Sequence, residues 1–253
     1  MTPNQRLERI KEIVTEKEKV FVADLSEFFD VTEETIRRDL QKLENDGMVT
    51  RIYGGAILNK KHLKEYAFFL KREATNVRSK EMIAEKALSL IGDGNTIMAD
   101  SSSTTLYTIR ACHQTRKITV ISNSTKLLQD FDGPSTVQII STGGIYDFSF
   151  KSFTGSFPQS FVENYNVDLA FISCKAIHKV KGIMDSTETE RDIKQSMAKQ
   201  AGKVCLLVDS SKFSKVGFVK LFDFHEIDYL ITDREPVNEW KEFLASQNVE
   251  VLY

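Results

Sequence analysis

The sequence of 253 residues predicts a two-domain α/β protein: a helix-turn-helix unit with a β-wing, followed by a larger domain with a mainly parallel sheet. Three patterns predict this fold class. Two short amphipathic helices meet at a tight turn, Asp30-Val31. Alternating apolar and polar residues lead into the paired glycines Gly54 and Gly55, as in a β-hairpin. From residue 80 onward, buried-type strands alternate with helices, which is typical of a parallel sheet covered by helices.

The helix predicted over Val31 to Asp46 carries the strongest functional signal of the first domain. Its buried stripe consists of Ile36, Leu40 and Leu43 at helical spacing. Thr32 stands at the N-cap position, and Gly47 can adopt the left-handed conformation that ends a helix. A solvated surface helix would show the same pattern. The flanking helix and wing instead favour a helix laid in a DNA groove.

A shorter helix precedes it, predicted over Val22 to Phe29 with Leu25 and the Phe28/Phe29 pair buried. Arginine can make bidentate contacts to guanine or bind phosphate, glutamine can pair with adenine, and a tyrosine hydroxyl can donate to phosphate. The predicted DNA-binding residues on the helix and wing are Thr32, Thr35, Arg37, Arg38, Gln41, Arg51, Tyr53 and Gly54.

Strands of the second domain are expected as short apolar runs. They fall at residues 96–99, 118–121, 137–140, 169–172, 204–208, 229–232 and 249–252. In an open parallel sheet, ligands bind beyond the carboxyl ends of the strands. The polar residues that follow these strands should therefore converge.

The strongest of these polar segments is Asp100 to Thr105, between a strand and a helix start. Backbone N–H groups, a positive helix end and several hydroxyls suit an anion, and ordinary helix capping by Ser and Thr is the alternative. Lys212 follows another strand, either as a phosphate-binding cation or as a plain surface lysine. The predicted effector-binding residues are Asp100, Ser101, Ser102, Ser103, Thr104, Thr105, Ser122, Asn123, Gly143, Gly144, Lys175 and Lys212.

Bulk composition is that of an ordinary globular protein, with 41% hydrophobic residues, 28% charged residues and a net charge of −2. The first sixty residues hold ten Lys and Arg against twelve Asp and Glu, which argues against DNA binding through a broad positive field. Cys112, Cys174 and Cys205 are too widely spaced for a metal motif or a disulfide framework and fit a reducing cytosol. We expect no metal, no cofactor, no signal peptide and no membrane span, and a cytoplasmic location.

The run from Thr35 to Ala56, T-I-R-R-D-L-x-x-L-E-x-x-G-M-V-x-R-x-Y-G-G-A, closely resembles the DeoR family of bacterial transcriptional regulators. Tyr53 stands where that family commonly has histidine. The second domain resembles the family's C-terminal sensor, which is similar in fold to ribose-5-phosphate isomerase. The matching segments are Lys80-x-x-Ile83-Ala84-x-x-Ala87, Ser122-Asn123-Ser124, Thr142-Gly143-Gly144, Gly155, Val167-Asp168-Leu169-Ala170-Phe171, Glu190-x-x-x-Lys194 and Asp209-x-Ser211-Lys212-Phe213.

The resemblance implies a phosphorylated sugar or a related metabolite as effector, and repression that the effector relieves. Ser102 stands where the family often has glycine in its phosphate loop, and serine lacks glycine's access to positive φ. Ser173 and Ala176 likewise stand at glycine positions of the family. We therefore expect a pocket that is reshaped for a different metabolite or that binds weakly.

The sequence is thus interpreted as a DNA-binding transcriptional regulator, a repressor of a carbohydrate-metabolism operon controlled by a phosphorylated sugar. Expected boundaries are 3–58 for the winged helix-turn-helix, 59–79 for a linker, and 80–253 for a sugar-phosphate-sensing and oligomerisation domain. Because one short winged unit should bind DNA weakly, we expect a homo-oligomer, a dimer or higher, on operator DNA. The second domain and the aromatic linker should supply its contacts.

One alternative is a regulator whose second domain only oligomerises, and the other is a sugar-phosphate isomerase with an added DNA-binding domain. Isomerases of the resembled fold place carboxylates directly after the strand that corresponds to residues 169–172. Here that strand is followed by Ser173-Cys174-Lys175-Ala176-Ile177, without an acid. We therefore expect the protein not to be an enzyme.

Overall fold

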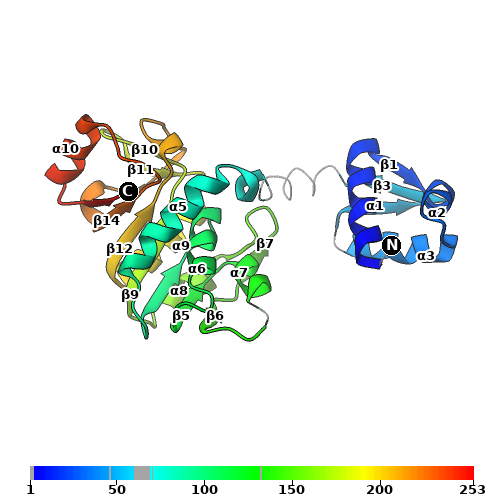
Figure 1. The fold of residues 1–253 in the computed structure, drawn as a ribbon, viewed down its shortest axis with the longest axis horizontal. Coiled ribbons are helices and arrows are strands. Elements are labelled where there is room, and N and C mark those ends of the chain that lie inside the picture. The colour runs from blue at the N-terminus through cyan, green and yellow to red at the C-terminus, as the bar shows by residue number, and fades with distance from the viewer. Residues whose placement is uncertain (1–2, 46, 60–68, 70, 132) are drawn as a thin grey trace. The chain divides into compact units, whose positions relative to one another are not determined.

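The computed structural model describes residues 3–45, 47–59, 69, 71–131 and 133–253. The chain divides between residues 68 and 69 into two compact units (Figure 1). The first unit contains a winged helix-turn-helix and the second a parallel sheet covered by helices, so the predicted fold class is confirmed.

The first unit packs helices against a small antiparallel sheet with the strand order β1-β3-β2. Its elements are α1 (Pro3–Lys17), β1 (Lys19–Phe21), α2 (Val22–Phe29), α3 (Glu33–Asn45), β2 (Val49–Ile52) and β3 (Gly55–Leu58). Asp30 and Gly47 have φ of 52° and 72°, so a left-handed residue follows each of the two helices of the motif. Asp46, in the predicted helix, lies outside the described residues.

The apolar stripe of α3 forms the centre of this unit's core, in one cluster with residues of α1, β1 and α2: Ile10, Val14, Val20 and Leu25. The expectation for the Phe28/Phe29 pair is wrong in part. Phe29 packs against the core, whereas Phe28 is 63% exposed. Neighbouring residues of a helix point about 100° apart, so only one of the two rings faces the core. Phe28 lies edge-on to Phe29, with ring centroids 4.8 Å apart.

A seven-stranded parallel sheet in the order β15-β14-β12-β9-β4-β5-β6 forms the middle layer of the second unit. Its strands are β4 (Thr96–Ala99), β5 (Ile118–Ser122), β6 (Val137–Ser141), β9 (Val167–Ser173), β12 (Ala201–Leu207), β14 (Tyr229–Ile231) and β15 (Glu250–Leu252). Each of them overlaps a predicted strand, which confirms the prediction of a mainly parallel sheet.

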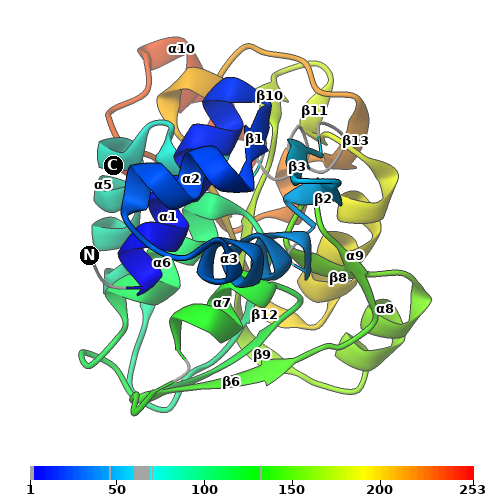
Figure 2. The same ribbon diagram turned by 90° about the vertical axis from the view of Figure 1, so that its right-hand side faces the viewer.

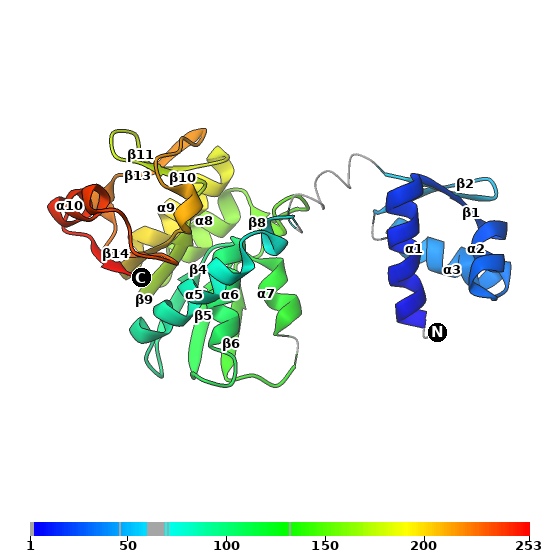
Figure 3. The same ribbon diagram turned by 45° about the horizontal axis from the view of Figure 1, so that its top comes forward.

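Helices cover both faces of the sheet (Figure 3). One face carries α5 (Val77–Ala87) with the 3-10 turn η1 (Leu88–Leu90), α6 (Ser103–Ala111) and α7 (Thr125–Asp130); the other carries α8 (Ser156–Val162), α9 (Glu188–Lys199) and α10 (Asn238–Ser246). Alternate residues of a strand point to opposite faces. Accordingly Ile97 and Ala99 lie in the core cluster on the first face, and Met98 lies in the cluster on the second.

A second, antiparallel sheet and a hairpin were not predicted. They comprise β10 (Ala176–His178), β11 (Gly182–Asp185) and β13 (Val219–Phe222), and the hairpin β7 (Ile145–Asp147) with β8 (Ser152–Thr154). Short 3-10 turns occur at η2 (Ser210–Lys212) and η3 (Phe224–Glu226). Strands of three or four residues are too short to show a clear period in the sequence.

The second unit begins earlier than residue 80, where we expected a linker to end. Phe69 is 2% exposed and belongs to the core beneath α5 and α6. Residues 71–74 are helical and precede α5. Residues 60–68 and 70, which include most of the aromatic part of the expected linker, lie outside the described residues. No described helix is long and apolar enough to cross a membrane.

Candidate functional sites

The predicted DNA-binding residues lie on α3, directly before it, and on the wing (Figure 2). Thr32 caps α3, because its Oγ1 accepts a hydrogen bond from the backbone N–H of Thr35 at 3.3 Å. The two threonine hydroxyl oxygens lie 2.9 Å apart. Arg37 and Arg38 are exposed, whereas Ile36 next to them is fully buried. The polar face of α3 is therefore exposed, and a molecule that binds to the first unit can reach its side chains.

Each arginine of this face is paired with a glutamate one helical turn earlier. Arg37 Nη2 lies 2.7 Å from Glu33 Oε2, and Arg38 Nε lies 3.3 Å from Glu34 Oε1. All four side chains are about half exposed or more, so each pair contributes at most about 0.5 kcal/mol to the helix. Phosphate and guanine offer arginine bidentate, charge-assisted hydrogen bonds. When the unit binds DNA, the two arginines can therefore exchange their glutamate partners for phosphate groups or guanine bases.

The wing is joined to α3 through Arg51. Its guanidinium group donates to the side-chain oxygen of Gln41, and its backbone N–H donates to Glu44 Oε1 at 2.8 Å. Tyr53 at the turn of the wing is fully exposed, and the neighbouring Gly54 has a φ of 74°. These hydrogen bonds hold β2 against α3, so that both elements can meet the same DNA duplex.

The second glycine of the pair, Gly55, is required by close packing. A Cβ atom at this position would lie 2.1 Å from the backbone oxygen of Val20 on β1. Gly55 pairs with Phe21 at that point of the sheet. Thus Gly54 supplies the left-handed turn, while Gly55 lets β1 and β3 approach.

A buried ion pair orients α3, and the sequence reasoning missed it. Arg6 Nε of α1 donates to Asp39 Oδ2 of α3 at 2.7 Å, and the two side chains are 11% and 4% exposed. The paired residues are 33 positions apart, so no local spacing connects them. The only signal in the sequence was a charged residue, Asp39, between the apolar positions Ile36 and Leu40 of the stripe.

In the second unit, the ends of neighbouring strands bring several predicted effector residues to one edge of the sheet. Asp100 follows β4, Ser122 ends β5, Gly143 follows β6, and Lys212 lies in the turn η2 after β12. The backbone N–H of Ser173, at the end of β9, donates to Asp100 Oδ2 at 3.0 Å. The Ser122 hydroxyl donates to the carbonyl at the end of β4 at 2.7 Å, so its role there is structural.

A buried lysine, Lys194 of α9, lies among three carboxylates of this edge. Its Nζ is 2.5 Å from Asp185 Oδ2, 3.1 Å from Asp100 Oδ2 and 3.8 Å from Glu190 Oε2. Burial opposes the charge of Asp100, but Lys194 and several hydrogen bonds hold the pKa of that carboxyl below its usual range. Burial raises the pKa of Glu190, and the neighbouring acids add to this effect against the attraction of Lys194. Glu190 also accepts hydrogen bonds from Ser101 at 3.1 Å and Ser152 at 3.4 Å.

The loop before α6 does not need the glycine that the family often has at the position of Ser102. Ser102 has a φ of −71°, a conformation open to any residue, so the concern about positive φ was wrong. Its Oγ accepts the backbone N–H of Thr105 at 3.2 Å and thereby caps α6. The backbone N–H groups of Ser103 and Thr104 have no acceptor among the described residues. These donors and the positive end of α6 form an anion-binding corner.

Two lysines flank this corner. Lys212 Nζ donates to Ser173 Oγ at 3.1 Å and lies 3.6 Å from Asp209 Oδ2. Lys80 of α5, which was not among the predicted site residues, is 4% exposed and donates to backbone carbonyls of residues 72, 73 and 75. Burial, together with the charge of Lys212, lowers the pKa of Lys80 to about 8. Two nearby cations beside a helix N-terminus favour a bound anion.

The remaining predicted residues differ in their roles. Lys175 is exposed, and no hydrogen bond or ion pair joins its side chain to other predicted members among the described residues. A Cβ atom at Gly144 would lie 2.6 Å from Pro158, so this glycine serves packing. Asn123 is fully buried; its Nδ2 donates to the Phe153 carbonyl at 3.1 Å, and its Oδ1 has no partner within the described residues.

Sequence reasoning also missed most charged residues of this edge as site members. Asp185, Glu190, Lys194 and Arg72 lie far from Asp100 in the sequence, yet the carboxylates of Asp100, Asp185 and Glu190 act on both Arg72 and Lys194. The four-residue spacing of Glu190 and Lys194 was a usable signal, because it places both side chains on one face of a helix.

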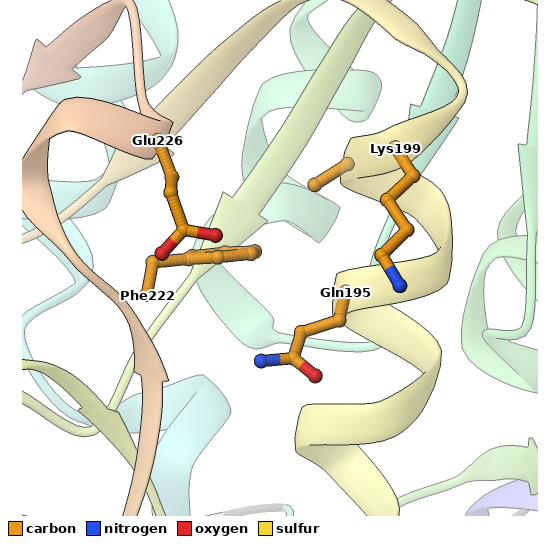
Figure 4. A pocket seen from close by; sticks show the side chains of 5 residues that line it. Gln195, Lys199, Phe222 and Glu226 are labelled. Carbon is orange, nitrogen blue, oxygen red and sulfur yellow. The ribbon is translucent and has the colours of Figure 1, made fainter.

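The later part of α9 borders a cavity of about 330 Å³ (Figure 4). Its lining consists of Gln195, Ala198, Lys199, Phe222 and Glu226. None of these was predicted to bind the effector. Glu226 Oε2 already accepts the backbone N–H of Asp223 at 2.6 Å. The candidate effector residues thus do not line this cavity.

A winged helix-turn-helix with an exposed arginine face, joined to an α/β domain with an anion-binding corner, is the arrangement expected of a transcriptional regulator that senses a ligand. The sequence matches the DeoR C-terminal sensor domain over residues 75–234 and the DeoR-like helix-turn-helix domain over residues 6–62. The protein belongs to the DeoR family of transcriptional regulators.

Three relatives show how far this likeness extends. The transcriptional regulator YulB of Bacillus subtilis is 35% identical, over 90% of this chain and 88% of its own length. The L-fucose operon activator of Haemophilus influenzae is 32% identical, over 97% and 98%. The transcriptional repressor GlcR of Bacillus subtilis is 31% identical, over 100% and 96%.

Solved structures resemble the chain more weakly. Ribose 5-phosphate isomerase A from Methanocaldococcus jannaschii has a TM-score of 0.40 and 18% identity, covering 56% of this chain and 57% of its own. The eIF2B beta subunit from Chaetomium thermophilum has a TM-score of 0.48 and 16% identity, covering 67% and 53%. The chain spans about half the length of these structures.

Proposed function

We propose that this DeoR-family regulator represses a carbohydrate-metabolism operon and releases its operator when a phosphorylated sugar binds to the second unit. The observation that carries the effector proposal is the corner at the α6 N-terminus. Two backbone donors there have no acceptor in the described part of the chain, and Lys80 and Lys212 flank them. A dianionic phosphate would satisfy both the donors and the cations. The name of the L-fucose operon activator agrees with a carbohydrate operon.

The sugar part of the effector would meet the carboxylate cluster. Sugar hydroxyl groups are donors as well as acceptors, and buried carboxylates are strong acceptors. Asp100, Asp185 and Glu190 surround Lys194 within hydrogen-bonding or ion-pairing distance. The Oδ1 atom of Asn123 is a further buried acceptor with no partner among the described residues. One arrangement of side chains therefore offers partners for both the phosphate group and the hydroxyl groups of a sugar phosphate.

Operator binding is assigned to residues 3–58 of the first unit, and effector sensing and oligomerisation to the second unit, which begins at Phe69. The first unit offers one recognition helix and one wing, and its arginines are partly neutralised by Glu33 and Glu34. Two copies on a two-fold operator would add a second half-site and raise the avidity. We therefore propose that the regulator acts as a homodimer or a higher oligomer. Sedimentation as a monomer at micromolar concentration, combined with tight operator binding, would contradict this.

Calorimetry of the full-length protein tests the effector proposal. Fructose 1-phosphate and fructose 6-phosphate are each compared with free fructose, and we expect measurable binding of a phosphate ester only. The variants Lys212→Ala and Ser103→Ala should weaken this binding and leave operator affinity without effector unchanged, because the DNA contacts lie in the other unit. Lys86→Ala is the matched control, since its side chain is exposed and it is not among the predicted effector-binding residues. Equal affinity for sugar and phosphate ester would rule out the phosphate corner.

The same samples test the alternative function. An isomerase would convert one fructose phosphate to its aldose isomer, which NMR detects directly. The three carboxylates around Lys194 are the place where proton transfer would have to occur. We expect binding without turnover.

A further inference from the structure

The carboxylate cluster of the candidate effector site is closed to a ligand in this conformation. The side chains of Asp100, Glu190 and Lys194 are only 1%, 3% and 4% exposed. Asn123, which follows the neighbouring strand β5, is fully buried, although its Oδ1 atom has no partner among the described residues. A sugar can therefore reach these groups only if an element that covers them moves aside.

The elements around the cluster differ in how firmly they are held. β4 and β9 lie in the middle of the seven-stranded sheet, and β11 is the middle strand of the second sheet. α9 contributes Ile193 and Met197 to the core on one face of the large sheet. The hairpin of β7 and β8 belongs to neither sheet. Because a two-stranded hairpin is only marginally stable by itself, it is the covering element that moves most easily.

The inner strand of this hairpin, β8, lies directly on the buried groups. Ser152 donates from Oγ to Glu190 Oε1 at 3.4 Å. The Phe153 carbonyl accepts a hydrogen bond from Asn123 Nδ2 at 3.1 Å, and its backbone N–H donates to the Asn123 carbonyl at 2.8 Å. Sugar hydroxyl groups both donate and accept, so they can take the places of the Ser152 hydroxyl and the Phe153 carbonyl.

Glycines in left-handed conformations stand at both ends of the hairpin. Gly143, before β7, and Gly155, after β8, have φ of 63° and 98°. A Cβ atom at Gly155 would meet only Ile145 among the described residues, at 3.6 Å, so packing does not require this glycine. The outer strand β7 leaves Ile145 and Tyr146 73% and 45% exposed. The hairpin can therefore turn about its ends without pulling β7 out of a core.

We propose that the hairpin of residues 145–154 is the gate of the candidate effector site. It swings outward about its glycine ends, admits the ligand to the carboxylate cluster and Asn123, and closes over it again. This inference rests on the proposed sugar-phosphate effector and adds the route by which that effector enters and leaves. The gate makes binding and release depend on the opening of one named segment.

A disulfide can lock this gate in its closed position. Ser124 and Ser152 form an isolated antiparallel bridge between the α7 N-cap and β8. The Thr125 N–H donates to the Lys151 carbonyl at 2.9 Å on one side of the bridge, and the hydrogen bond from the Phe153 N–H lies on the other. This pattern makes the bridge a non-hydrogen-bonded pair, whose Cα atoms lie about 4.5 Å apart, within the range of a disulfide.

The test uses the full-length double variant Ser124→Cys/Ser152→Cys with fructose 1-phosphate as the probe. The reduced form of the same protein is the matched control, and the three native cysteines are buried. The reduced form should bind the probe at about the wild-type rate. When the disulfide forms before the probe is added, association should be at least about tenfold slower. When it forms afterwards, the probe should stay bound through gel filtration and leave on reduction.

Hydrogen exchange tests the gate without the disulfide. In the wild type, the Phe153 amide should exchange at least about tenfold faster than the amides of β9, because the hairpin opens without unfolding the sheet. Saturating fructose 1-phosphate should slow the exchange of this amide. Ser152→Ala removes the contact with Glu190 and should speed it. These measurements decide the question if the double variant does not fold.

Two results would overturn the inference. One is equal association and release of the probe in the oxidised and reduced double variant. The other is a Phe153 amide that exchanges as slowly as the amides of β9 in the wild-type protein. A wild-type protein that does not bind fructose 1-phosphate is a separate result, because it counts against the proposed function before any variant is compared. Exchange at Phe153 then still decides whether the hairpin opens.

Discussion

Replacement of Asp39 by alanine tests the buried ion pair that orients the recognition helix. The change leaves the Arg6 guanidinium group in a site where its side chain is only 11% exposed. Loss of one partner from a buried pair costs about 3–5 kcal/mol, because the other charge stays buried without compensation. Arg6 is long and retains some access to water, so we expect the lower end of that range, about 3 kcal/mol.

That loss is large for a unit of this size. Stability of about 0.05–0.15 kcal/mol per residue gives roughly 3–9 kcal/mol for a unit of some sixty residues. Asp39→Ala should therefore remove between about a third and all of the free energy of unfolding of the winged unit. Operator affinity should fall with it, while the second unit keeps its stability.

Hydrogen exchange in the full-length protein measures this effect at the amides of α3, with amides of β9 as the internal reference. The matched control is Arg9→Ala on the same α1 helix, which removes an exposed pair with Glu12 whose side chains are 53% and 63% exposed. We expect less than about 1 kcal/mol there. The double variant Arg6→Met/Asp39→Leu should regain most of the loss, because no charge remains buried. Equal effects of Asp39→Ala and Arg9→Ala, each below about 1 kcal/mol, would refute the reasoning.

Three further predictions follow from the same structure. Gly55→Ala should open the wing and abolish operator binding, because the added Cβ falls 2.1 Å from the Val20 carbonyl; Gly54→Ala, at a φ of 74° in open space, should cost only about 1–2 kcal/mol, and exchange of wing amides compares the two. Arg38→Ala should lower operator affinity by about 1–3 kcal/mol if it reads a base, or reduce the salt slope if it binds phosphate; unchanged anisotropy titrations at two salt concentrations would exclude both. Affinity for fructose 1-phosphate should fall above pH 8, since burial and a neighbouring lysine lower the pKa of Lys80 to about 8 and only its protonated form attracts the dianion; a flat calorimetric profile from pH 7 to about 9.5 would contradict this.

The boundaries of α2 and α3 and the strands of the parallel sheet could be predicted from the sequence. The stripe of Ile36, Leu40 and Leu43 repeats within one helix, and its caps lie within a few residues of it. Buried strands of four to seven residues likewise give continuous apolar runs. These signals lie within short stretches of sequence, so they can be recognised without knowledge of the fold.

The residues of the effector corner could be predicted only in part. Asp100 to Thr105 and Lys212 lie next to strand ends, where a parallel sheet must gather polar groups. The same rule named Lys175, whose role stays a prediction, and the comparison with the family's glycine gave Ser102 a strain that its φ of −71° does not have. Position along the strand does not determine which way a loop side chain points.

Partner choice among the buried charges was decided by the tertiary structure alone. Asp100 and Asp185 reach Lys194 from different strands, and Arg6 reaches Asp39 from another helix. In the sequence each of these residues resembles an ordinary surface charge. Their low exposure and altered pKa values arise because chain packing removes water around them and leaves only opposite charges within reach. The sequence by itself determined the class of regulator through local patterns, and the fold decided which charges face the corner proposed to sense the effector.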